Sequence, residues 1–292
     1  MNEREILLFV FIAIIKTISV AGAGTMGRGI AQVIAQAGYR VILFDINRDV
    51  LGMARLEITK RLEQLVVKQK ISAEQSKQIQ DHIRFTNTIS DCKSDLVIEA
   101  ALEDLAVKKH LFLQLAGINT QDCILSTNTS SLPVTDIAAT IPLPARFAGL
   151  HFFNPAPLMK LVEVVQTKFT SPDVTTTLCD FVLSISKVPV VCQDAPGFIV
   201  NHVARPYYLE ALRLLGQGIE PSVIDDIMEA TGFKMGPFRL MDLIGNDINY
   251  AVSVSVYNAL GKPSRLEPSP AQKELVENKR LGQKSGSGFY SY

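Results

Sequence analysis

The chain has 292 residues, which is enough for two domains or one large one, and 47% of them are apolar, as in a globular protein with a full core. Its 29 Lys and Arg residues balance 29 Asp and Glu residues, which excludes holding nucleic acid or an anionic membrane by bulk charge. Cys92, Cys123, Cys179 and Cys192 form no CxxC pair and lack zinc-ligand spacing. We therefore predict no metal site, and buried thiols in a reducing compartment, the cytoplasm.

The first 15 residues contain the apolar run ILLFVFIAII, whose ten residues (6–15) are too few to span a bilayer. Glu3 and Glu5 outweigh Arg4 at the place where a signal peptide would be positive. We interpret residues 1–15 as a leader or packed arm without an assigned role, and membrane contact through it stays open.

From residue 16, strand-like and helix-like segments alternate. A polar helix pair is expected over 47–81, with Ser72 and Gln75 as its possible cap. Strands are predicted at these runs: 17–21, 40–45, 82–86, 94–100, 123–127, 146–152 and 160–165. Strand, helix and strand in succession indicate right-handed crossovers and a mostly parallel sheet.

The pattern changes after the apolar run at 188–192. The remaining segments have helical periodicity and are separated by glycines and prolines; they lie at 196–215, 221–231, 237–260 and 270–279. We therefore predict a Rossmann-type, doubly wound α/β domain over 16–192 and an all-helical domain over 193–292.

A glycine-rich stretch, Gly22-Ala23-Gly24-Thr25-Met26-Gly27, follows the first predicted strand and opens the first helix. In GxGxxG the first glycine allows a tight turn, the second lets backbone approach a pyrophosphate, and the third lets helix and strand pack closely. Asp45 ends the next strand, where it would bind ribose hydroxyls and repel a 2′-phosphate. These features predict NAD as the cofactor; the alternative is a glycine-rich turn without a ligand.

The stretch HFFNPAPLMKLVEVV (151–165) places two titratable groups in an apolar hairpin. His151 ends a strand, at the edge where open α/β sheets bind ligands. In a hairpin centred on Pro157, His151 faces Glu163, and a carboxylate on one imidazole nitrogen fixes the tautomer and supports a positive ring. We interpret them as a catalytic pair. The alternative is two incidental polar residues, and a one-residue slip of the register would separate them.

Three more polar segments fall where ligands are expected. STNTSS (126–131) closes a strand, Glu103 and Lys108 start a helix after another strand, and Asn201 lies in the first turns of the helical domain. Each of them also has a plain interpretation as a helix cap or surface residue.

Five segments together resemble one known family: GAGTMGRGIAQ, STNTSSL, HFFNPAPLMKLVEVV, DAPGFIVNH and GQKSGSGFY. In this order and spacing they are similar to the short-chain L-3-hydroxyacyl-CoA dehydrogenases, a group that includes the bacterial 3-hydroxybutyryl-CoA dehydrogenases. The resemblance covers residues 16–292. It implies an oxidoreductase that reversibly oxidises a short (S)-3-hydroxyacyl-CoA to the 3-ketoacyl-CoA with NAD, and a homodimer formed through the helical domain. The expected setting is fatty acid metabolism and β-oxidation, while butyrate formation and aromatic degradation use the same step and stay open as alternatives.

The resemblance also implies roles for single residues. His151 would be the general base and Glu163 the carboxylate that orients it. Ser130 and Asn201 would bond the substrate oxygen, and Lys68, in the helix pair, would contact coenzyme A. Besides the glycine loop and Asp45, the cofactor would be contacted by Glu103, Lys108, Ser130 and Asn154.

Two alternative functions are weighed against this one. The first is a related dehydrogenase acting on a 3-hydroxy acid without coenzyme A. The motifs HFFNP and NTSSL argue against it. The second is a non-catalytic dinucleotide-binding protein, which would have no use for His151, Glu163, Asn201 and Ser130 together.

Overall fold

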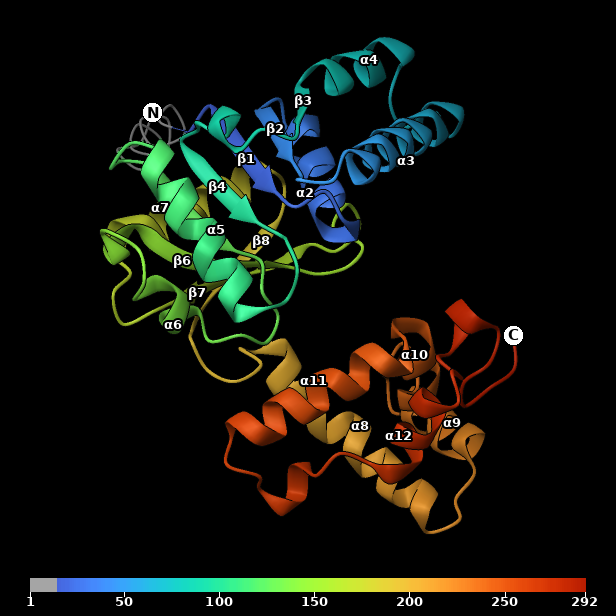
Figure 1. The fold of residues 1–292 in the computed structure, drawn as a ribbon. Coiled ribbons are helices and arrows are strands. Elements are labelled where there is room, and N and C mark those ends of the chain that lie inside the picture. The colour runs from blue at the N-terminus through green and yellow to red at the C-terminus, as the bar shows by residue number, and fades with distance from the viewer. Residues whose placement is uncertain (1–14) are drawn as a thin grey trace, which may run out of the picture. The chain divides into compact units, whose positions relative to one another are not determined.

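The computed structural model describes residues 15–292, and the chain divides into two compact units, the first ending at Asp194 and the second running from Ala195 to Tyr292 (Figure 1). The predicted boundary stood near residue 192. The expectation of a leader or arm concerns residues of which 1–14 lie outside the described part. No helix within residues 15–292 combines the length and hydropathy needed to cross a bilayer.

The first unit is built on an eight-stranded sheet in the order β3-β2-β1-β4-β5-β6-β7-β8. Its strands are β1 (Thr17–Ala21), β2 (Arg40–Phe44), β3 (Ile83–Thr86), β4 (Leu96–Glu99), β5 (Ile124–Thr127), β6 (Phe147–Phe152), β7 (Leu161–Gln166) and β8 (Val188–Gln193). All neighbouring strands are parallel except β6 and β7. The prediction of a mostly parallel sheet is confirmed, and the order of the first six strands is that of a Rossmann fold, with its switch point between β1 and β4.

Helices cover both faces of this sheet: α2 (Thr25–Gln36), α3 (Arg48–Val67), α4 (Ala73–Asp81), α5 (Leu105–Ile118), α6 (Val134–Ala138) and α7 (Pro172–Ser184). One core cluster joins residues of α2, α3 and α7 to strand residues such as Ile98 and Leu150. On the other face, the rings of Phe112 in α5 and Phe147 in β6 lie 4.8 Å apart. Because side chains alternate along a strand, His151 belongs to the same face as Phe147.

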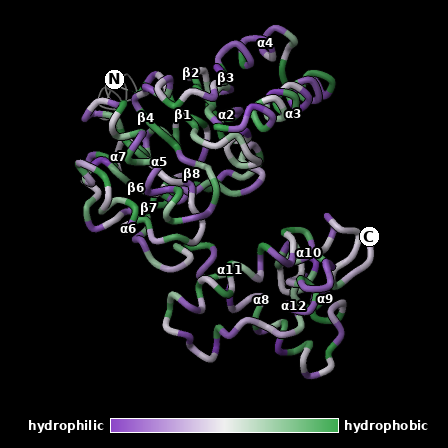
Figure 2. Tube along the Cα trace, in the orientation of Figure 1, coloured by the Kyte–Doolittle hydropathy of each residue, from purple (hydrophilic) through white to green (hydrophobic). Residues whose placement is uncertain are grey.

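The predicted helix pair at 47–81 is confirmed as α3 and α4. Ser72 caps α4 through a capping box, in which its Oγ accepts from Gln75 N at 3.0 Å and Gln75 Oε1 accepts from Ser72 N at 2.8 Å. Figure 2 shows many hydrophilic residues along α4, as expected for a helix with two buried positions, Ser76 and Ile79.

The second unit is helical, as predicted, and consists of α8 (Val200–Gly216), α9 (Pro221–Ala230), α10 (Pro237–Ile244), α11 (Asn246–Ala259) and α12 (Pro270–Glu277). The single helix predicted over 237–260 is wrong: Gly245 has φ +104° and separates α10 from α11. The first helix begins at Val200 rather than 196, because Gly197 and Phe198 have φ of +77° and +48°, outside the helical region.

Candidate active site

The loop between β1 and α2 needs two of its glycines for packing. Gly22 has φ +109°, and a Cβ there would lie 2.5 Å from the carbonyl oxygen of Ala100. A Cβ on Gly27 would lie 1.7 Å from the carbonyl oxygen of Gly22. Gly24 differs, since no heavy atom lies within 4 Å of its ideal Cβ position. The loop is therefore closed around Gly22 and Gly27 and open at Gly24.

The open side of this loop is the N-terminus of α2, which Thr25 and Met26 begin. Within this fully described helix, the first turn contains no acidic residue, and the N-cap Gly24 offers no side-chain hydrogen bond. Its first N–H groups therefore keep their capacity to bind an anion, and the helix dipole adds partial positive charge. The arrangement fits a pyrophosphate beside Gly24.

Asp45 follows β2 directly and is tied to this loop. Its Oδ2 accepts from Ala23 N at 2.8 Å, and its Oδ1 accepts from Asn47 N at 2.9 Å. A carboxylate has about four lone-pair positions, so each oxygen keeps one for a further donor. The half-buried carboxylate is thus fixed in orientation and suited to accept from two neighbouring ribose hydroxyls.

His151 and Glu163 are register partners in the antiparallel pair of β6 and β7. The predicted register is confirmed, and the Nδ1 of His151 lies 2.7 Å from the Oε2 of Glu163. His151 is 5% exposed and Glu163 is fully buried. Low polarity around the pair strengthens its electrostatic interaction and restricts the ring to one orientation.

A second buried ion pair lies at the carboxyl end of β4. The Nζ of Lys108, a residue 1% exposed, donates to Glu99 Oε1 at 2.6 Å. Glu99 also accepts from Ala101 N at 2.6 Å and from the hydroxyl of Thr127 at 2.6 Å. The network thereby fastens the ends of β4 and β5 to α5. The sequence reasoning missed Glu99, although it carries the same signal as Glu163, an acid inside an apolar strand.

Glu103 connects this buried pair to the surface. Its side chain is 38% exposed, and its Oε2 lies 3.2 Å from Lys108 Nζ. Its Oε1 accepts from the Thr129 hydroxyl at 2.5 Å and from Ser130 N at 3.1 Å. Burial alone would raise the pKa of Glu103, but Lys108 and these hydrogen bonds more than offset it and hold the pKa below its ordinary value. Glu103 is therefore ionised at neutral pH.

The other predicted site residues are distributed as follows. Asn154 is exposed at the start of the turn that joins β6 to β7, and Ser130 is half-buried after β5. Asn201 belongs to the second unit, in the first turn of α8. Lys68 is the exposed C-cap of α3, a helix of 20 residues that spans roughly 30 Å from its start near Asp45. The structure thus brings together the glycine loop, Asp45, Glu103, Lys108 and Ser130, and leaves Lys68 at the far end of α3.

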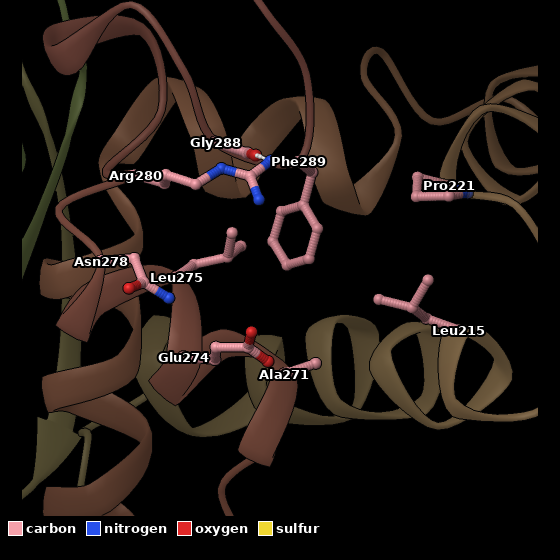
Figure 3. A pocket seen from close by; sticks show the side chains of 9 residues that line it. All are labelled: Leu215, Pro221, Ala271, Glu274, Leu275, Asn278, Arg280, Gly288 and Phe289. Carbon is pink, nitrogen blue, oxygen red and sulfur yellow. Dashed lines mark hydrogen bonds between the residues drawn. The ribbon is translucent and has the colours of Figure 1, made fainter.

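No group of three or more His, Cys, Asp or Glu side chains able to hold a metal ion exists among residues 15–292. A cavity of about 280 Å³ opens in the helical unit, where Leu215, Leu275 and Phe289 line it and Arg280 donates to the carbonyl of Gly288 at 2.7 Å (Figure 3). Leu215 lies fourteen residues beyond Asn201 on α8, which is roughly 21 Å along the axis. This cavity contains none of the predicted site residues.

Family models match nearly all of the described chain. Residues 17–195 match the model described as 3-hydroxyacyl-CoA dehydrogenase, NAD binding domain, and residues 197–292 match the 3-hydroxyacyl-CoA dehydrogenase, C-terminal domain. Among curated proteins, 3-hydroxyadipyl-CoA dehydrogenase of Escherichia coli is 49% identical over 281 residues, which are 95% of this chain and 59% of that protein. Mitochondrial hydroxyacyl-coenzyme A dehydrogenase of Sus scrofa is 41% identical over 290 residues, 96% of this chain and 92% of that protein.

Solved structures give the same picture. A crystal structure of 3-hydroxybutyryl-CoA dehydrogenase from Escherichia coli has a TM-score of 0.92 and 49% identity, and the match covers 95% of this chain and 59% of that one. The (S)-3-hydroxybutyryl-CoA dehydrogenase of Ralstonia eutropha has a TM-score of 0.91 and 34% identity, with 95% of this chain and 99% of that one covered. This chain therefore spans about three fifths of the Escherichia coli proteins and nearly the full length of the others.

Proposed function

Because the chain belongs to the 3-hydroxyacyl-CoA dehydrogenase family, we propose that it reversibly oxidises a short (S)-3-hydroxyacyl-CoA to the 3-ketoacyl-CoA with NAD. The observation that carries the proposal is the buried 2.7 Å contact between His151 and Glu163. This contact lies on the sheet whose first loop is shaped for a dinucleotide.

The proton is handled by His151. Glu163 at Nδ1 fixes the tautomer, so that Nε2 removes the proton of the substrate hydroxyl and returns it in the reverse direction. Glu163 then stabilises the imidazolium that forms. When bound, NAD supplies the hydride acceptor. General base catalysis of this kind contributes about 10²–10⁴-fold, and positioning and electrostatics supply the rest.

The remaining residues bind and orient. Asp45 accepts from the adenosine ribose, and the N-terminus of α2 beside Gly24 binds the pyrophosphate. Ser130 and Asn201 hydrogen-bond the substrate oxygen, while Glu103 and Asn154 line the nicotinamide half of the site. Lys108 acts there through Glu103, since its own ammonium is buried and bound to two carboxylates. Lys68, at the end of α3, contacts coenzyme A.

The helical unit offers a surface for a homodimer. Val223 and Ile227 lie one turn apart on α9 and are 48% and 57% exposed, and Phe233 after the helix is 51% exposed. Burying such side chains between two copies would remove apolar area from water. Light scattering should give the mass of a dimer, and Ile227→Glu should shift it to that of a monomer.

The four unpaired cysteines suit a reducing compartment, and we place the enzyme in the cytoplasm.

A direct assay tests the reaction. Acetoacetyl-CoA should be reduced with NADH, whereas gulonate should not be oxidised with NAD, and the opposite result would favour a dehydrogenase of acids without coenzyme A. Tight NADH binding without turnover of any acyl-CoA would instead indicate a non-catalytic dinucleotide-binding protein.

A further inference from the structure

Helix α8 buries a guanidinium that no carboxylate within residues 15–292 neutralises. Arg205 is 3% exposed, and its side chain projects among α8 and α11. The arginines that form ion pairs within residues 15–292 all have side chains at least 36% exposed. Arg205, by contrast, forms no ion pair with the Asp and Glu residues described. A buried positive charge without a counter-ion needs an explanation, because burial of an uncompensated charge is costly.

The hydrogen bonds of Arg205 use only part of its guanidinium. Nε donates to the carbonyl of Asn201 at 2.8 Å, and Nη1 donates to the carbonyl of Asn249 at 3.1 Å and the hydroxyl of Ser253 at 2.8 Å. A guanidinium has five N–H donors, so these bonds leave the two on Nη2. Nη2 has no hydrogen-bond partner among residues 15–292, yet it is not one of the fully buried atoms without a partner, so it borders accessible space.

The contacts of Arg205 fix its position but leave its charge without a counter-ion among residues 15–292. Neutral carbonyl and hydroxyl groups fix its position, and the ring of Tyr208, 5.0 Å away, adds a weak cation–π contact. Neither neutralises the charge. Burial lowers the pKa of Arg205 to about 10, with Tyr208 acting in the opposite direction, so the group remains charged near neutral pH. An anionic group arriving at Nη2 would supply both the missing charge and the missing acceptor.

We propose that Arg205 binds a carboxylate at the far end of the substrate's acyl chain, so that the preferred substrates are 3-hydroxydicarboxylyl thioesters of coenzyme A. This inference rests on the proposed function, in which Asn201 holds the oxygen at C3. Arg205 follows Asn201 by four residues on α8, a spacing that puts their Cβ atoms about 5–6 Å apart on one face. In a six-carbon dicarboxylic chain, three carbon–carbon bonds separate C3 from the terminal carboxyl carbon, which is a comparable span.

The experiment compares two substrates of equal length, (S)-3-hydroxyadipyl-CoA and (S)-3-hydroxyhexanoyl-CoA, by NADH formation. The wild-type enzyme should show a kcat/KM at least about 10-fold higher for the dicarboxylic substrate. Arg205→Met should lower that value about 10²-fold and leave the value for the hexanoyl substrate within about 3-fold. Arg205→Lys should keep part of the preference, because it keeps the charge but loses the planar fork.

Arg213→Met is the matched control. Arg213 lies on the same helix, but it forms a surface ion pair with Glu210 at 2.8 Å, so its loss should change neither substrate. Equal rates of the wild type on both substrates, or an equal loss on both in Arg205→Met, would overturn the assignment. Should Arg205→Met fail to fold, the substrate ratios of the wild type and Arg205→Lys decide the question. Failure to turn over either substrate, or acetoacetyl-CoA, would overturn the proposed reaction instead.

Discussion

A Cβ atom on Gly27 would lie 1.7 Å from the carbonyl oxygen of Gly22, so helix α2 can approach strand β1 only if residue 27 has no side chain. Gly24, three residues earlier, is under no such constraint, because nothing lies within 4 Å of its Cβ position. The two glycines of this loop thus differ: Gly27 is required for packing, whereas Gly24 has open space beside it, where the proposed function puts the pyrophosphate.

Substituting these glycines should therefore separate stability from binding. Gly27→Ala should destabilise the protein by about 1–3 kcal/mol, the usual cost of overpacking. Gly24→Ala should leave the free energy of unfolding within about 0.5 kcal/mol and weaken NADH binding. Urea unfolding and titration of NADH fluorescence measure the two quantities. A Gly24→Ala protein that binds NADH as the wild type does would contradict a pyrophosphate at this position.

Removing the imidazole should abolish turnover without loss of the cofactor. His151→Gln should lower kcat by about 10²–10⁴-fold or more while NADH affinity stays close to that of the wild type. Glu163→Gln should cause a smaller loss, because the imidazole remains but its positive form loses the carboxylate. Steady-state kinetics and NADH titration on both variants check this. If His151→Gln kept most of the activity, another group would have to be the base.

Lys108 should matter for stability more than its place near a cofactor site suggests. Lys108→Met leaves Glu99 buried without its cation, and breaking a buried pair in this way costs about 3–5 kcal/mol. Lys109→Met, one residue along the same helix and less buried, should cost about 0.5 kcal/mol or less. Urea unfolding of both variants provides the comparison, and equal stabilities would show that the Glu99 pair is energetically neutral.

The lowered pKa of Glu103 predicts a pH dependence. A carboxyl whose folded pKa lies below its unfolded value of 4.5 stabilises the fold above that pH, and this contribution is lost as the pH falls through the folded pKa. The difference in unfolding free energy between wild type and Glu103→Gln should thus be constant near neutrality and shrink below about pH 4.5. Solvent screening of the partly exposed side chain keeps the effect modest. The exposed Glu63→Gln serves as control, and a difference that grows on acidification would refute the linkage.

The sequence predicted those features whose determinants are close together in the chain. The strands, the glycine loop and the His151–Glu163 register follow from local periodicity and from one short turn. The break at Gly245 was missed because helical periodicity continues on both sides of it. The bond between Glu99 and Lys108 was missed because it forms only when α5 folds back against the end of β4. The lack of a carboxylate beside Arg205 could not be predicted either, because it depends on which groups α11 places there.

The single antiparallel pairing within the described sheet also bears on the order of folding. Parallel neighbours require a crossover, whereas β6 and β7 are joined directly by residues 153–160. Closing so short a segment costs little chain entropy, so this hairpin can pair before the distant strands find one another. Amide exchange pulse-labelling during refolding should find β6 and β7 protected ahead of β1 and β4. The imidazole and its carboxylate would then meet early in folding, before β1 and β4, whose ends border the proposed dinucleotide site, have paired.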